Sequence, residues 1–154
     1  MISPTRRRVE GHTDQSINER IRRQTESNVL YFAGEGRQKI DRRLADLDWE
    51  WDMERTLEAN AASITLLGLG LGALVDRRVF VLAAVVAAFL LQHAIQGWCP
   101  PVPVFRRLAF RTASEIDQER YALKAVRGDF DNLHPKDDRV GETEARRILD
   151  TVSR

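Results

Sequence analysis

The middle of the chain carries almost no charge, and this limits the possible folds more than any other feature. Between residues 59 and 97, the charged side chains are confined to the triplet Asp76, Arg77 and Arg78. The triplet separates two uncharged stretches, 59–75 and 79–98, of 17 and 20 residues. As helices rising about 1.5 Å per residue, they would measure about 25 and about 30 Å. The hydrocarbon core of a bilayer is roughly 30 Å thick, so the second length suits a membrane and the first is marginal alone. Thr56 and Leu57, or local thinning of the bilayer, can supply its missing turn.

The second stretch gives the stronger argument for a membrane. Every residue from Val79 to Leu91 is apolar, so a helix there offers no polar side to water. A connection of three residues joins only antiparallel neighbours. The sequence therefore predicts an all-α protein with a two-span transmembrane helical hairpin, with spans at about 59–75 and 79–97. The alternative is a soluble four-helix bundle with the same two helices buried at its centre.

Hydrophilic arms flank this hairpin. Residues 1–58 carry 11 basic and 12 acidic side chains, and residues 99–154 carry 11 and 10. We therefore divide the chain into a helical arm at 1–58, the hairpin at 59–98, and a proline elbow with a second helical arm at 99–154. The net charge of +1 argues against a general nucleic-acid binder, and the single cysteine excludes an internal disulfide.

The first arm is predicted to hold amphipathic helices. The capping-box pattern of Ser16 and Glu19 opens a helix over 16–32. A second apolar periodicity starts near Arg37, and no helix breaker separates it from the first span, so the two are expected to run together.

The second arm begins with three prolines between positions 100 and 103, which predict a stiff, non-helical elbow. Thr112 and Glu115 form another capping box, and the helix that they open is expected to end at Gly128. A loop at 129–139 and a weak amphipathic helix at 142–152 complete the chain.

Small residues predict where the two spans pack. Gly68 and Gly72 form a G-x-x-x-G pattern, and Ala83 and Ala87 repeat small-xxx-small on the second span. Such positions allow close backbone approach between membrane helices, and the same faces offer a route to a homo-oligomer. The glycine run has no lysine and no preceding strand, so it does not match a phosphate-binding loop.

Aromatic and basic residues are expected to mark the boundary with water. Trp49, Trp51 and Trp98 are candidate interfacial anchors, although an ordinary packed helix face explains the first two equally well. Arg106 and Arg107 are candidate contacts for anionic lipid headgroups, against the alternative that they pair with acidic side chains. Six arginines flank the membrane on the side of the termini, against two in the turn, so both termini are predicted to be cytoplasmic.

Candidate chemistry is limited to one thiol. Cys99 would be reactive if a neighbour such as His93 or Arg106 lowered its pKa. The loop around Cys99 is rich in proline and lacks the glycines and free amides that hold an oxyanion, which favours a structural elbow. No catalytic residue is therefore assigned, and Cys99 stays a candidate.

No metal site or cofactor is predicted. His12, His93 and His134 are scattered and have no ligand spacing. With Gln92 and Gln96, His93 makes a polar patch near the inner end of the second span, where we expect helix-end hydrogen bonding.

Several features lie together in residues 52–108, about a third of the chain: Glu54 and Arg55 before the first span, glycines in that span, an Ala/Val/Leu-rich second span, and Gly97-Trp98-Cys99-Pro100 at its end. In these features the chain resembles small bacterial membrane proteins with the YgaP-like transmembrane domain, a family of unknown function. Members commonly continue Cys-Pro with Leu-Tyr, whereas this chain has Pro101 and Val102. Some relatives fuse the hairpin to a rhodanese sulfur-transfer domain, which is absent here, so the resemblance implies sulfur chemistry only as an option for Cys99.

The expected role is a membrane anchor or interaction module in the bacterial inner membrane, with no catalytic activity. Its predicted partners are the lipid bilayer and a second copy of the chain, not nucleic acid. The alternative is a thiol-active accessory protein in sulfur or redox handling that uses Cys99.

Overall fold

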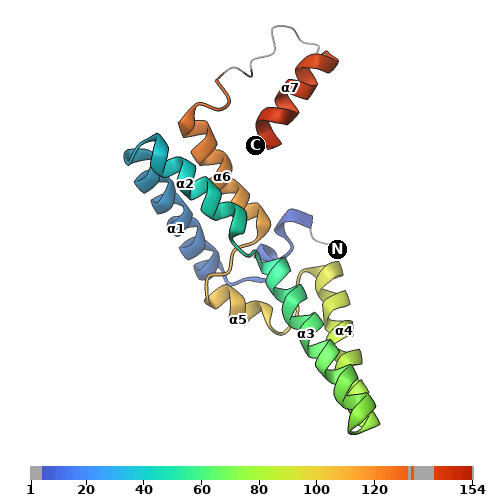
Figure 1. Ribbon diagram of the computed structural model, residues 1–154. Helices are drawn as coiled ribbons and strands as arrows, with labels where there is room; N and C mark the ends of the chain where they lie inside the picture. Colours follow the sequence, from blue (N-terminus) through green and yellow to red (C-terminus); the bar gives the residue numbers. More distant parts are fainter. Residues whose placement is uncertain (1–4, 132, 134–140, 154) are drawn as a thin grey trace.

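The computed structural model describes residues 5–131, 133 and 141–153. Within these residues all regular structure is helical, and a long hairpin projects from a bundle of shorter helices (Figure 1). The predicted fold class, an all-α chain with a hairpin and flanking helices, is confirmed. The helices are α1 (Gln15–Gly34), α2 (Arg37–Trp49), α3 (Met53–Leu74), α4 (Phe80–Gln96), α5 (Val102–Arg107), α6 (Ala113–Arg127) and α7 (Glu142–Ser153), with 3-10 turns η1 (Thr5–Arg7), η2 (Glu10–His12) and η3 (Arg77–Val79).

Helices α3 and α4 lie antiparallel and form the hairpin (Figure 1). Asp76 caps the turn between them, because its carboxylate accepts a hydrogen bond from the Arg78 amide at 2.9 Å. Gly68 brings the helices together: a Cβ there would lie 3.3 Å from the Ala83 nitrogen. At Gly72, a Cβ would lie 2.8 Å from the Phe80 ring. Glycine is therefore the residue that fits this seam at both positions.

The outer surface of the hairpin is apolar and uncovered by the described chain. The most apolar 18-residue windows within 37–74 and 77–96 are only 17% and 11% buried. The helical segments in these two ranges, which include α3 and α4, are long and apolar enough to cross a membrane. In a soluble bundle with these helices at its centre, most of this surface would be buried by neighbouring helices, and the described part of the chain has no such arrangement.

The two hydrophilic arms build one bundle. Helices α1 and α2 come from the first arm and α6 from the second, and they pack side by side (Figure 1). Their apolar faces meet in a core to which all three helices contribute: Ile40, Leu44, Leu47, Ile116 and Leu123, with Val29 and Phe32 against it. The arms are thus one structural unit, which the sequence analysis treated as two.

A second apolar core lies where the bundle meets the hairpin. It joins the N-terminal segment, the start of α3 and the elbow after α4 through Val9, Met53, Leu57, Cys99 and Val102. Gly97 ends α4 with φ +77°, and a Cβ there would lie 2.6 Å from Arg8. The N-terminal segment therefore packs directly on the end of α4.

The structure separates α2 from α3, which the sequence analysis expected to run together. Glu50 is extended, with φ −66° and ψ 125°. The Asp52 carboxylate then accepts a hydrogen bond from the Arg55 amide at 2.7 Å and starts a new helix. An aspartate that caps a helix N-terminus in this way competes with continuation of the preceding helix.

The non-helical elbow is shorter than predicted, because α5 begins within it at Val102. Pro101 is the N-cap of α5 and Pro103 lies in its first turn, where a missing amide hydrogen costs no helical bond. The start of α1 differs by a small shift, since Asp14 rather than Ser16 caps it.

The remaining boundaries agree with the sequence. Thr112 and Glu115 form the expected capping box, and Gly128 ends α6 with φ 87°. Helix α7 matches the predicted segment at 142–152. Of the predicted loop at 129–139, residues 132 and 134–139 lie outside the described residues.

Candidate functional site

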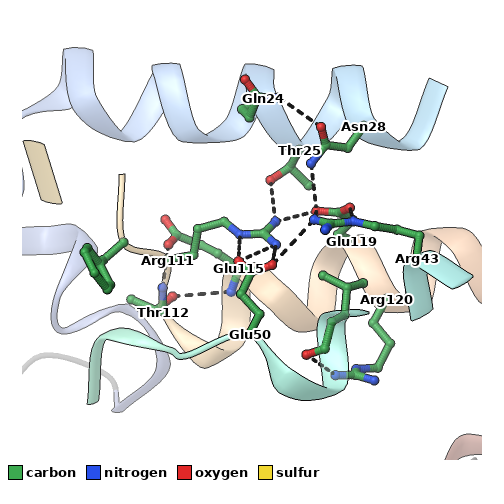
Figure 2. Close-up of polar contacts among 12 residues, drawn as sticks. Gln24, Thr25, Asn28, Arg43, Glu50, Arg111, Thr112, Glu115, Glu119 and Arg120 are labelled. Atoms are coloured by element: carbon green, nitrogen blue, oxygen red, sulfur yellow. Dashed lines mark hydrogen bonds and ion pairs between the residues drawn. The ribbon is translucent and has the colours of Figure 1, made fainter. Parts of the chain in front are cut away.

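Buried charges gather where the bundle approaches the hairpin (Figure 2). The centre is Glu119 of α6, whose side chain is 0% exposed. Arg43 of α2 donates to it from Nε at 2.7 Å, and Asn28 of α1 donates from Nδ2 at 3.2 Å. A further donor is Arg111, whose Nη1 bonds the Glu119 Oε2. Three helices and the segment before α6 therefore meet at one carboxylate.

Arg111 connects this carboxylate to the loop before α3. It holds Glu50 with two hydrogen bonds, from Nε to Oε1 at 2.7 Å and from Nη2 to Oε2 at 2.8 Å. The backbone carbonyl of Arg111 also accepts the Met53 amide at 2.8 Å, at the first residue of α3. Figure 2 shows Arg111 between the two carboxylates, with Thr25 of α1 above it.

A separate buried ion pair joins α5 to α6. Arg106 of α5 is fully buried and binds Glu115 of α6 at 2.7 Å and 2.8 Å through its two terminal nitrogens. It also donates to the Asn18 side chain at 2.8 Å and to the Phe110 carbonyl at 3.0 Å. Glu115 accepts the Thr112 amide as well, so one carboxylate both caps α6 and pairs with α5.

The electrostatics of Glu119 indicate a structural role. Burial raises the pKa of Glu119, but hydrogen bonds from Arg43 and Arg111 outweigh it and hold that pKa below its ordinary value. Burial likewise opposes the charge on Arg43, and the Glu119 contact outweighs it, so the pKa of Arg43 lies above its ordinary value. Both groups stay ionised at neutral pH and cannot exchange protons with a substrate there. The arrangement holds helices together and does not resemble an acid–base site.

The candidate thiol lies in an unfavourable place for nucleophilic chemistry. Cys99 is buried in the core between bundle and hairpin. Burial raises the pKa of this thiol, and the contact with the Val102 amide offsets only part of the effect. Arg106, a candidate for lowering the pKa of Cys99, directs its guanidinium at Glu115 instead. The geometry does not favour the thiol-active alternative.

The candidate interfacial anchors differ in exposure. Trp49 is 80% exposed, Trp51 is exposed beneath the Arg55 guanidinium at 4.7 Å, and Trp98 is half-buried. Arg107 is exposed, as an anchor must be. The prediction that Arg106 is an interfacial anchor is wrong. Its side chain is fully buried in an ion pair with Glu115, so it cannot present its charge to lipid headgroups.

The candidate packing residues differ in exposure. Gly68, Gly72 and Ala83 lie in the seam between α3 and α4. Ala87, one helical turn after Ala83, is exposed. Any self-association therefore has to use exposed residues such as Ala87, since the glycines are already occupied within one chain.

His93 is buried, and neither of its ring nitrogens has a hydrogen-bond partner. The helix-end hydrogen bond expected for the His93 side chain is therefore not found. The Gly97 amide donates to the backbone carbonyl of His93 instead. Arg8 and Glu54 also hold buried atoms without a partner. Buried polar atoms of this kind are commonly satisfied by ordered water.

No metal site emerges from the part of the chain that the structure describes. No three residues among its His, Cys, Asp and Glu side chains lie together as ligands. The His12 ring contacts the Arg8 carbonyl at 2.9 Å, and His134 lies outside the described residues.

The buried ion pairs were missed by the sequence analysis, although a signal was present. Ile116, Glu119 and Leu123 are spaced by three and four residues, so they share one side of a helix. A glutamate in an apolar stripe requires a buried partner. Which arginine supplies that partner depends on how α1, α2 and α6 assemble, and no local pattern gives this.

Comparisons with known proteins add no family assignment. No protein-family model, curated protein or solved structure matches this chain. The resemblance to the YgaP-like transmembrane domain therefore stays a prediction from the residues.

Proposed function

We propose that this protein is a small bacterial inner-membrane protein that holds a cytoplasmic helical bundle at the membrane surface. The observation that carries the proposal is the apolar and uncovered outer side of the hairpin. Large exposed apolar residues cover it, including Leu66, Leu67, Leu69, Leu71, Leu74, Val81, Leu82, Val85 and Leu91. Soluble monomers rarely expose so many large apolar side chains together, and contact with lipid tails removes them from water.

The junction between bundle and hairpin supports a positioning role. Arg111 bonds Glu119 in α6, Glu50 before α3, and the first amide of α3. The apolar core around Met53 and Val102 joins the same parts. A bundle connected so firmly to a membrane hairpin keeps a fixed orientation to the bilayer. This suits a module that presents a surface to a partner.

The orientation follows from the arginines. The described ends of the chain, η1 and α7, lie on the side of the bundle and the junction rather than at the tip of the hairpin (Figure 1). Six arginines flank the membrane on that side, against Arg77 and Arg78 in the turn. The positive-inside rule then places the bundle and both termini in the cytoplasm. Self-association in the membrane would use the exposed small residues of α4, Ala84, Ala87 and Ala88.

An alkaline carbonate wash of cell membranes tests the membrane assignment. We expect the protein to stay in the membrane pellet, as an integral membrane protein does, while a peripheral protein in the same sample is released. Release of this protein with the peripheral control would contradict the proposal.

A further inference from the structure

An apolar groove runs along one side of the hairpin and ends at the proline elbow. It has a volume of about 240 Å³. Its walls come from α3 and α4, including Ala61, Ile64 and Phe89, and Pro100 and Pro101 close it at the bundle end. Its lining is almost entirely apolar, and Asn60, the polar side chain on its wall, is bonded to the Thr56 carbonyl at 2.8 Å.

Helix α5 continues this apolar surface. It starts directly after Pro101, and its two sides differ sharply. Val102 and Arg106 are completely buried, whereas Val104 is 55% exposed and Leu108, just after the helix, is 65% exposed. Arg107 is exposed beside Leu108 and places a positive charge next to these apolar side chains.

A strained corner fixes the direction of α5. Ala109 has φ 65°, a left-handed conformation that costs a residue with a side chain about 1 kcal/mol or more. The Phe110 amide bonds the Phe105 carbonyl at 3.0 Å, and the Ala109 amide bonds the Arg106 carbonyl at 3.0 Å. Together with the contact between the rings of Phe105 and Phe110, this is a Schellman motif. The motif keeps both aromatic rings at the junction core and leaves Leu108 at the outer corner.

We propose that the groove and α5 together bind a phospholipid. One acyl chain lies in the groove, and the headgroup lies over α5 next to Arg107. Val104 and Leu108 then contact the boundary between headgroups and tails, which explains why apolar side chains face outward on a helix attached to the end of a membrane span. The inference rests on the proposed membrane location and adds a specific lipid contact to it.

The groove is tested by gentle release of the protein from detergent into a mass spectrometer. Ala61 lines the groove, and its neighbour Ala62 is exposed outside it, so Ala61→Phe and Ala62→Phe form a matched pair. We expect one phospholipid adduct on the unsubstituted protein and on Ala62→Phe, and at least a tenfold loss of adduct on Ala61→Phe. Equal adducts on all three proteins, or none on any, would overturn the inference.

The position of α5 is tested with spin labels in vesicles of phosphatidylethanolamine and phosphatidylglycerol. Cysteines replace Val104 or Leu108 in a Cys99→Ser chain, and Val126→Cys serves as an exposed control on α6. We expect collisions with oxygen relative to a water-soluble nickel chelate to be several-fold higher at 104 and 108 than at 126. If the ratio of oxygen collisions to nickel-chelate collisions at positions 104 and 108 equals that at position 126, the lipid contact is contradicted.

A label on the hairpin separates this inference from the membrane proposal. Leu66→Cys lies on the exposed side of α3 and should report the bilayer interior. If position 66 is in lipid while 104 and 108 are in water, only the phospholipid site is refuted. If position 66 is in water as well, the proposed membrane location fails with it.

Discussion

At the scale of single residues, loss of the buried Glu119 side chain should strongly destabilise the fold. Its removal takes away the carboxylate that pairs with the buried guanidinium groups of Arg43 and Arg111. Removal of one partner of a buried ion pair typically costs about 3–5 kcal/mol. We expect Glu119→Ala to lower the free energy of unfolding in detergent micelles by this amount. Glu26→Ala removes a solvent-exposed pair with Arg22 and should change it by less than about 1 kcal/mol. Equal effects of both substitutions would contradict the structural role of Glu119.

The pH dependence of Glu119 has a defined sign. Its pKa in the fold lies below the ordinary value of 4.5, so its stabilising contribution is complete above that value. The contribution is lost as the pH falls through the lowered pKa. Unfolding followed by circular dichroism should therefore show a loss of stability below about pH 4.5 that is smaller in Glu119→Gln.

Ala109 provides a second prediction at this scale. Glycine adopts its left-handed conformation without strain, so Ala109→Gly should raise the free energy of unfolding by about 0.5–1 kcal/mol. Ala122→Gly, inside α6, should lower it by about 1 kcal/mol because glycine disfavours a helix interior. Destabilisation by both substitutions would show that Ala109 is not strained.

At the scale of elements, the seam between α3 and α4 can be tested with neighbouring glycines. A side chain at Gly68 meets the backbone of Ala83, whereas at Gly70 it meets nothing within 4 Å. We expect Gly68→Leu to separate the two helices and Gly70→Leu to leave them in place. Distances between spin labels on α3 and α4 in vesicles measure this directly. Equal distances in both variants would contradict the seam.

Helix α7 is predicted to dock more firmly as the pH rises. It contacts Lys124 of α6, a buried lysine whose Nζ donates to the Val152 carbonyl at 3.1 Å. Burial is the largest cause that lowers the pKa of Lys124, followed by the charge of Arg120, so desolvation of the charged form opposes docking to the extent that α7 buries this side chain. This destabilisation is present at neutral pH and is relieved as the pH rises through the lowered pKa toward 10.5.

Spin labels at Ser27→Cys and Thr143→Cys should therefore show a docked population of α7 that grows between neutral pH and about pH 10. Lys124→Met keeps the length of the side chain and removes its charge. In this variant, the docked population of α7 should already be high at neutral pH and should change little as the pH rises. A smaller docked population in Lys124→Met would show instead that the lysine holds α7 in place.

Local patterns were sufficient for some elements and not for others. The uncharged stretches predicted the hairpin, and Thr112 with Gly128 predicted α6, because apolar runs and caps act within a few residues. The break at Glu50 and the short α5 were missed, although Asp52 and Pro103 carry local signals for them. These signals are weak alone, and distant contacts support them, because Arg111 holds Glu50 and Glu115 holds Arg106. The same reason explains why the joining of the two arms was not foreseen.

At the scale of the whole molecule, the dimensions of the hairpin suit a full crossing. Helix α3 has 22 residues and α4 has 17, which correspond to about 33 and about 26 Å. The start of α3 through Leu57 belongs to the junction core, so about 26 Å of each helix remains. This is slightly less than a bilayer core of roughly 30 Å, a difference that local thinning of the bilayer accommodates. With the proposed membrane location, the bundle lies on one side of the bilayer and the tight turn on the other.

The most direct test of this central claim is the side on which the turn is exposed. In Cys99→Ser chains, a membrane-impermeant maleimide is added to intact spheroplasts that carry Arg78→Cys in the turn or Ser27→Cys in the bundle. The account predicts labelling of Arg78→Cys in intact spheroplasts and of Ser27→Cys only after lysis. Labelling of both positions under the same condition would contradict a hairpin that crosses the membrane.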